Sequence, residues 1–87
     1  MAEIKFNPEM DGVGWLYRSA FYLAQGKNKQ AMLFLDKASE KIKKYFSNDL
    51  VNLTRQPNKY LTNQKQSNFW AEKILDEYHR IFMLVKF

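Results

Sequence analysis

The stretch GVGWLYRSAFYLAQGKNKQAMLFLDKASEKI, residues 12–42, determines the fold expected of this chain. Its first half, from about Val13 to Gln25, carries apolar side chains on nearly every face of a helix. A helix that is apolar all round must be covered on more than one side, so we expect it in the centre of the fold or against a partner. Residues 25–26 break this helix and residues 27–29 turn the chain. The stretch therefore predicts two antiparallel helices joined by a short turn.

The second helix of this hairpin is expected from about Lys29 to Phe46. Apolar residues recur along it at spacings of four, three, four and three, which is the pattern of one buried helix face. These residues are Ala31, Leu35, Ala38, Ile42 and Tyr45. The opposite face carries three lysines, Lys37, Lys41 and Lys44. We therefore expect this helix to bury one side and to expose a basic side.

The order of large and small residues in the hairpin resembles the consensus of the tetratricopeptide repeat, in which small side chains let two antiparallel helices approach closely. The residues that carry the resemblance are Trp15, Ser19, Tyr22, Gln25, Gly26, Ala31, Met32, Leu35, Lys37 and Ala38. It covers one degenerate repeat, residues 12–45. Two positions depart from the consensus: Arg18 replaces a large apolar residue, and Lys43 replaces the proline that normally ends the second helix. No second copy follows, and the alternative is an unrelated hairpin that obeys the same packing rules.

The resemblance implies a helical module that binds another protein. Ligands of the family lie along the first helix of a repeat, and the equivalent face here would present Val13, Leu16, Ala20 and Leu23. Because these side chains are apolar, the resemblance implies that they would accept an apolar segment or helix. The alternative is that the C-terminal helix covers them.

Three further segments complete the expected single domain. The hairpin occupies residues 12–46. The three other segments are an extended arm (residues 1–11), a linker (residues 47–66) and a C-terminal helix (residues 67–87). Pro8 would open a short helical turn, Gly12 and Gly14 would flank a turn, Asp49 would cap a linker helix, and Pro57 would turn the chain. We expect an all-α bundle of three main helices and a short linker helix. Its core would contain Trp15, Leu16, Tyr22, Leu35, Ile42, Trp70, Ile74, Tyr78 and Ile81.

The C-terminal end of the last helix is apolar on two sides. It carries Ile81, Phe82, Met83, Leu84, Val85 and Phe87. A three-helix domain of this size covers one side of that helix, and a remaining exposed apolar area is typical of an interface. We therefore expect Phe82, Leu84 and Phe87 to bind a protein partner, which would be a second copy in a homodimer or another chain. The alternative is that this end folds back over the linker helix and completes a monomeric core.

The basic character of the chain favours a second class of partner. Its net charge is +5, and basic residues exceed acidic ones between Lys27 and Lys73. The predicted nucleic-acid-binding residues are Lys37, Lys41, Lys44, Arg55 and Lys59, which would supply contacts to phosphates. Asp36 and Glu40 interleave with these lysines, so a solvated helix face that keeps the protein soluble is the alternative.

The sequence offers little chemistry to an enzyme. It has no cysteine, one histidine, no glycine-rich phosphate loop and no nucleophile–base set that spacing could place. Glu72, Asp76 and His79 share one helix face, but a metal site would need further carboxylates from a facing helix. We expect no catalytic residue, metal site or cofactor, and therefore a non-enzymatic interaction module or small regulatory subunit.

Two observations bear on location. No run approaches the roughly 20 apolar residues needed to span a bilayer, and the first residues do not form the apolar region of a signal peptide. The lack of cysteine fits a reducing compartment. We therefore expect a cytoplasmic protein.

Overall fold

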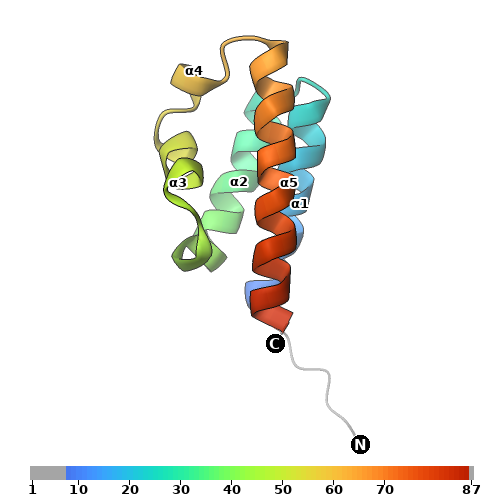
Figure 1. Ribbon diagram of the computed structural model, residues 1–87, viewed down its shortest axis with the longest axis vertical. Helices are drawn as coiled ribbons and strands as arrows, with labels where there is room; N and C mark the ends of the chain where they lie inside the picture. Colours follow the sequence, from blue (N-terminus) through green and yellow to red (C-terminus); the bar gives the residue numbers. More distant parts are fainter. Residues whose placement is uncertain (1–7, 87) are drawn as a thin grey trace, which may run out of the picture.

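The computed structural model describes residues 8–86, and helices occupy most of them (Figure 1). In chain order they are α1 (Pro8–Ala24), α2 (Asn28–Ile42), the 3₁₀ turn η1 (Lys43–Tyr45), α3 (Asn48–Arg55), α4 (Pro57–Tyr60) and α5 (Gln64–Lys86). No strand occurs among the described residues. The predicted all-α fold is confirmed.

Helix α1 packs against both other long helices. It forms an antiparallel hairpin with α2, and α5 packs along it. The short helices α3 and α4 lie on the other side of α2 and α5 from α1 (Figure 1). The apolar circumference of α1 agrees with its place, because a helix that is apolar on most sides must be covered on more than one side.

The turn between α1 and α2 is a Schellman motif. The N–H of Lys27 donates to the carbonyl of Tyr22, and the N–H of Gly26 donates to the carbonyl of Leu23. The N···O distance is 3.0 Å in both hydrogen bonds. Gly26 has φ 79°, a conformation that costs residues with a Cβ about 1–2 kcal/mol. The predicted break at this glycine is therefore a structural requirement of the hairpin.

The start of α1 differs from the expected arm and turn. Helix α1 begins at Pro8, in the first helical position where its missing N–H costs nothing, so residues 8–11 are helical and not extended. Residues 1–7 lie outside the described residues. Gly12 and Gly14 lie inside the helix, so the prediction that they flank a turn was wrong. The buried Gly12 is needed for close packing, since a Cβ there would lie 2.7 Å from the Cβ of Lys41 on α2.

The core joins all three long helices to α3. Of the nine predicted core residues, Leu16, Leu35, Ile42, Trp70, Ile74 and Ile81 are buried, whereas Trp15, Tyr22 and Tyr78 are partly buried against the core. Helix α3 adds Leu50 and Leu53, which are both buried. The linker segment is therefore part of the core.

The linker begins and ends differently from the prediction. The α-helical part of α2 stops at Ile42 and continues as the 3₁₀ turn η1, so it is shorter than expected. Ser47 caps α3, whereas Asp49 was the predicted cap. The Oγ of Ser47 accepts a hydrogen bond from the N–H of Leu50, with an N···O distance of 3.3 Å. Pro57 does not only turn the chain but also opens the one-turn helix α4.

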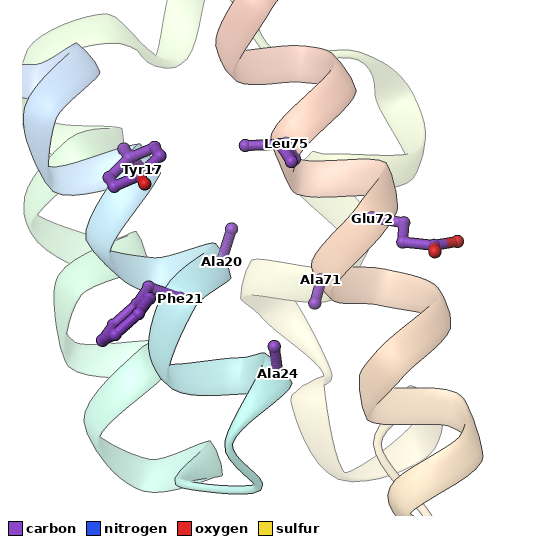
Figure 2. Close-up of a pocket in the computed structure, with 7 residues that line it drawn as sticks. All are labelled: Tyr17, Ala20, Phe21, Ala24, Ala71, Glu72 and Leu75. Atoms are coloured by element: carbon purple, nitrogen blue, oxygen red, sulfur yellow. The ribbon is translucent and has the colours of Figure 1, made fainter.

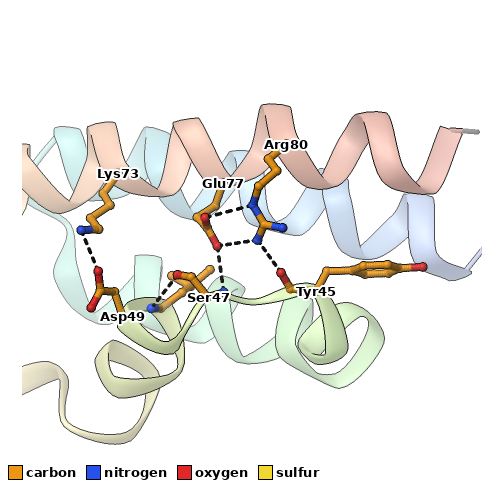
Figure 3. A network of polar contacts seen from close by, with 7 residues as sticks. Tyr45, Ser47, Asp49, Lys73, Glu77 and Arg80 are labelled. Carbon is orange, nitrogen blue, oxygen red and sulfur yellow. Dashed lines mark hydrogen bonds and ion pairs between the residues drawn. The ribbon is translucent and has the colours of Figure 1, made fainter.

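A polar network ties α5 to the segment that precedes it (Figure 3). Glu77 of α5 accepts hydrogen bonds from the N–H of Ser47 (3.0 Å) and from Arg80 (2.9 Å), and Arg80 also donates to the carbonyl of Tyr45. One turn away, Lys73 and Asp49 form an ion pair of 2.8 Å. Burial raises the pKa of Glu77, but the hydrogen bonds from Arg80 and Ser47 outweigh it, so this pKa lies below its usual value.

Candidate interaction surface

The face of α1 that the tetratricopeptide resemblance selected lies in the core. Val13, Leu16, Ala20 and Leu23 are at most 5% exposed. They belong to one apolar cluster with buried residues of α2, α3 and α5. Together these four residues therefore form no open groove, and of them Ala20 alone also borders the apolar surface between α1 and α5 described below.

The C-terminal end of α5 is divided between core and surface. Ile81 is buried, and Phe82 is partly buried with its ring centroid 6.0 Å from that of Tyr78. Met83 and Leu84 are 52% and 53% exposed. Phe87 lies outside the described residues. Of the residues predicted to bind a partner here, Leu84 is thus the one that the structure places in solvent.

A third apolar surface, which sequence reasoning did not select, lies between α1 and α5 (Figure 2). It is a groove of about 230 Å³, and we name it the α1–α5 groove. The residues that line it are Tyr17, Ala20, Phe21, Ala24, Ala71, Glu72 and Leu75. Figure 2 shows Tyr17 and Leu75 pointing toward each other across one end, while Glu72 points outward from α5.

Helical periodicity explains the shape of this groove. Tyr17, Phe21 and Ala24 recur at spacings of four and three along α1, and Ala71 and Leu75 are four apart on α5. The alanines form a low floor because their side chains end at Cβ. Tyr17 (48% exposed), Phe21 (54%) and Leu75 (36%) stand beside it. The apolar circumference of α1 in the sequence was the signal of this surface, since the core covers only part of it.

A second groove of about 420 Å³ lies between α2 and the region of α4. Its apolar lining includes Met32, Leu33, Pro57 and Leu61, and Leu33 is 62% exposed. Leu33 is the one exposed large apolar side chain of this groove, whereas three exposed large apolar side chains, Tyr17, Phe21 and Leu75, surround the α1–α5 groove. Leu33 therefore provides a matched exposed residue at a different surface.

The residues predicted to bind nucleic acid do not share one surface. The Nζ of Lys37 lies 5.1 Å from the ring centroid of Trp15 on α1, and Lys44 forms a 3.0 Å ion pair with Glu9. The hydrogen bond to Glu9 raises the pKa of Lys44 and lowers that of Glu9. Arg55 ends α3 and Lys59 lies in α4, on the other side of α2 (Figure 1).

The seam between α1 and α2 combines aromatic rings with cations. The ring of Phe34 lies 5.2 Å from Trp15 and 5.1 Å from Tyr22. Arg18 and Lys37 lie over Trp15 at 4.9 and 5.1 Å, and Lys27 lies 5.6 Å from Tyr22. We name these six residues the aromatic seam. The sequence pattern pointed to Lys37 but not to the rings. Trp15 and Tyr22 had been expected in the core, and Phe34 had not been assigned to any site.

Two further features are absent from residues 8–86. No three His, Cys, Asp or Glu side chains within this range come together as metal ligands. Nor does any helix of the same range combine the length and apolarity needed to cross a membrane. Comparisons of the chain with protein-family models, curated proteins and solved structures find no match.

Proposed function

We propose that this protein is a non-enzymatic interaction module, an adaptor or small regulatory subunit that binds a protein partner through the α1–α5 groove. The observation that carries the proposal is the exposure of Tyr17, Phe21 and Leu75 around a floor of alanines. Exposed apolar patches on small soluble domains mark interaction sites. The helical hairpin of α1 and α2 adds support, because tetratricopeptide-like modules present helix surfaces to partners.

The energetics favour a partner that covers this groove. Burial of apolar surface stabilises a complex by about 25 cal/mol per Å², and aromatic side chains bury the most area. Tyr and Arg are also enriched among residues that dominate interface energies, and Arg18 follows Tyr17 directly. The chain contains no cysteine, so a reducing compartment such as the cytoplasm suits the module, which cell fractionation would test.

Affinity capture from an extract of the source cell tests the proposal. Immobilised wild-type protein is compared with Phe21→Glu, which places a charge at the groove, and with Leu33→Glu, which places the same charge on the surface of α2. We expect at least one protein to bind the wild type and Leu33→Glu but not Phe21→Glu. The same set of proteins on all three would exclude the α1–α5 groove as the binding surface.

A second candidate function is single-stranded nucleic-acid binding, and the aromatic seam favours it. Aromatic side chains stack on bases and cations contact phosphates, which is how sequence-tolerant single-strand binding works. Trp15, Tyr22 and Phe34 are partly buried, so part of each residue remains accessible. The net charge of +5 adds long-range attraction.

Anisotropy of a labelled single-stranded oligonucleotide tests this candidate. Affinity should fall steeply as salt rises, because phosphate contacts release counterions. Lys27→Glu combined with Lys37→Glu, two cations of the aromatic seam, should abolish binding, whereas Phe21→Glu should leave it unchanged. Equal loss with Arg55→Glu combined with Lys59→Glu would argue against the aromatic seam, since those residues lie on α3 and α4.

A further inference from the structure

We infer that the partner in the α1–α5 groove is a second copy of this chain, bound about a two-fold axis so that α1 of each copy packs on α5 of the other. This inference rests on the proposed function and names its partner. Closed two-fold dimers are the commonest assembly of soluble proteins, and such an interface must be complementary to itself. The α1–α5 groove meets that condition in shape and in charge.

The shape of the groove is self-complementary. Ala20, Ala24 and Ala71 leave a low floor, and large side chains beside it project into solvent. When two such surfaces meet, the projecting Phe21 of one copy can fill the space above the alanines of the other. Knobs that enter holes in this way are the usual packing of four-helix arrangements.

The charges distinguish between the two ways of pairing the helices. Glu72 and Asp76 are exposed and four residues apart on α5, and Glu72 lines the groove. On α1 the exposed charge that follows Tyr17 is Arg18, which lies outside the groove lining with its guanidinium over Trp15. Packing α5 on α5 would bring acidic residues of both copies together, and like charges repel. Packing α1 on α5 instead brings Arg18 of one copy to the acidic edge of the other.

The positions of Arg18 and Asp76 along the helix axes agree with the packing of α1 on α5. The rings of Tyr17 and Tyr78 lie 5.2 Å apart, so the antiparallel helices place Arg18 level with the turn that holds Asp76. A two-fold axis parallel to the helices preserves this height. Arg18 of one copy therefore meets Asp76 of the partner subunit, and the four helices alternate in direction.

Sedimentation equilibrium of the purified chain tests the inference. The wild type should reach twice the 10.4 kDa chain mass at high micromolar concentration. Phe21→Glu should be a monomer, and Leu33→Glu should remain a dimer. Far-UV circular dichroism establishes that each variant keeps its helices. A monomeric wild type would overturn the inference, as would a dimer that survives Phe21→Glu or that Leu84→Glu dissociates.

A charge exchange tests the pairing itself. Arg18→Glu and Asp76→Arg should each weaken the dimer by about tenfold or more, since each creates a repulsive pair. The double variant restores the attraction and should recover most of the lost affinity. Additive losses in the double variant would overturn the pairing of α1 with α5.

The capture experiment separates failure of this inference from failure of the proposed function. A monomeric wild type that still binds another protein through Phe21 overturns the dimer and leaves the interaction module in place. A monomeric wild type without any Phe21-dependent partner overturns both.

Discussion

A missing side chain at Gly12 sets how closely α1 approaches α2. A Cβ at this position would lie 2.7 Å from the Cβ of Lys41 and 3.0 Å from Cγ2 of Ile42, so the helices must move apart to admit it. Gly12→Ala should therefore destabilise the protein by about 1–3 kcal/mol, as overpacking does. Gly14→Ala is the control, because a Cβ there meets nothing within 4 Å. It should stabilise α1 by about 0.5–1 kcal/mol.

Urea denaturation of both glycine variants measures these free energies of unfolding. Opposite signs are the expected result, since the two substitutions differ in surroundings and not in helix propensity. Equal stabilisation by both would show that α2 does not approach α1 at Gly12.

Ser19 is a second position where one atom matters. Its side chain is fully buried, and its Oγ has no hydrogen-bond partner among the described residues. A buried hydroxyl without a partner carries a desolvation cost of about 1–3 kcal/mol. We expect Ser19→Ala to stabilise the protein by up to about 1 kcal/mol, because alanine fills nearly the same space. Thermal denaturation measures the change, and a fall in Tm would reveal a partner for the hydroxyl.

At the scale of elements, Glu77 links the stability of α5 to pH. Its pKa is depressed in the folded state, so the unfolded state binds more protons at acidic pH. The contribution of Glu77 is therefore fully present above the ordinary glutamate pKa of about 4.3 and is lost as pH falls through the folded value. We expect Glu77→Gln to lose about 1 kcal/mol at neutral pH. This is less than the roughly 1.5–3 kcal/mol of a hydrogen bond to a charged group, because Arg80 is partly exposed and glutamine can still accept one hydrogen bond.

The pH dependence of that loss is the sharper measurement. The stability curves of the wild type and Glu77→Gln should converge as pH falls below about 4. Burial and then Glu40 raise the pKa of Asp36, which has the opposite effect on stability, but Asp36 is present in both proteins and cancels. Parallel curves down to acidic pH would show that the carboxylate of Glu77 is not held by Arg80 and Ser47.

The elements differ in how well the sequence predicts them. The hairpin was predictable because a buried stripe such as Ala31, Leu35 and Ala38 repeats over several turns, and because Gly26 marks its turn. The helical turn expected at Pro8 is present, but its continuation into α1 through residues 8–11 and the helix α4 were missed. Their few residues carry no periodic signal, and their helical state depends on contacts with distant parts of the chain. The ion pair between Glu9 and Lys44 is one such contact.

The candidate surface was predictable only in part. The apolar circumference of α1 shows that several of its sides must be buried. The sequence does not show which of these sides the other helices of the domain bury and which remain exposed. The resemblance pointed to the face of Leu16 and Leu23, and the structure buries these two side chains in the core that α1 shares with α2 and α5. The exposed remainder, Tyr17 and Phe21, follows from the positions of those two helices, which local spacing does not encode.

At the scale of the whole molecule, the short helices belong to the same core as the bundle. Leu50 and Leu53 of α3 are buried in it, and the ring of Tyr60 in α4 meets Trp70 of α5 at 5.4 Å. The network around Glu77 adds polar ties between α5 and the same segment. Residues that share one core unfold together, so we expect a single cooperative transition.

The two tryptophans allow that expectation to be tested at both ends of the core. Trp15 lies at the seam of α1 with α2, whereas Trp70 lies next to α4. Trp15→Phe leaves Trp70 as the only tryptophan and Trp70→Phe leaves Trp15, so fluorescence reports on one region in each variant. In each variant the urea transition followed by fluorescence should coincide with the transition followed by far-UV circular dichroism. This comparison within one variant removes any effect of the substitution on stability itself. A fluorescence transition of Trp70 that precedes the loss of helix would show that α3 and α4 detach before the bundle unfolds.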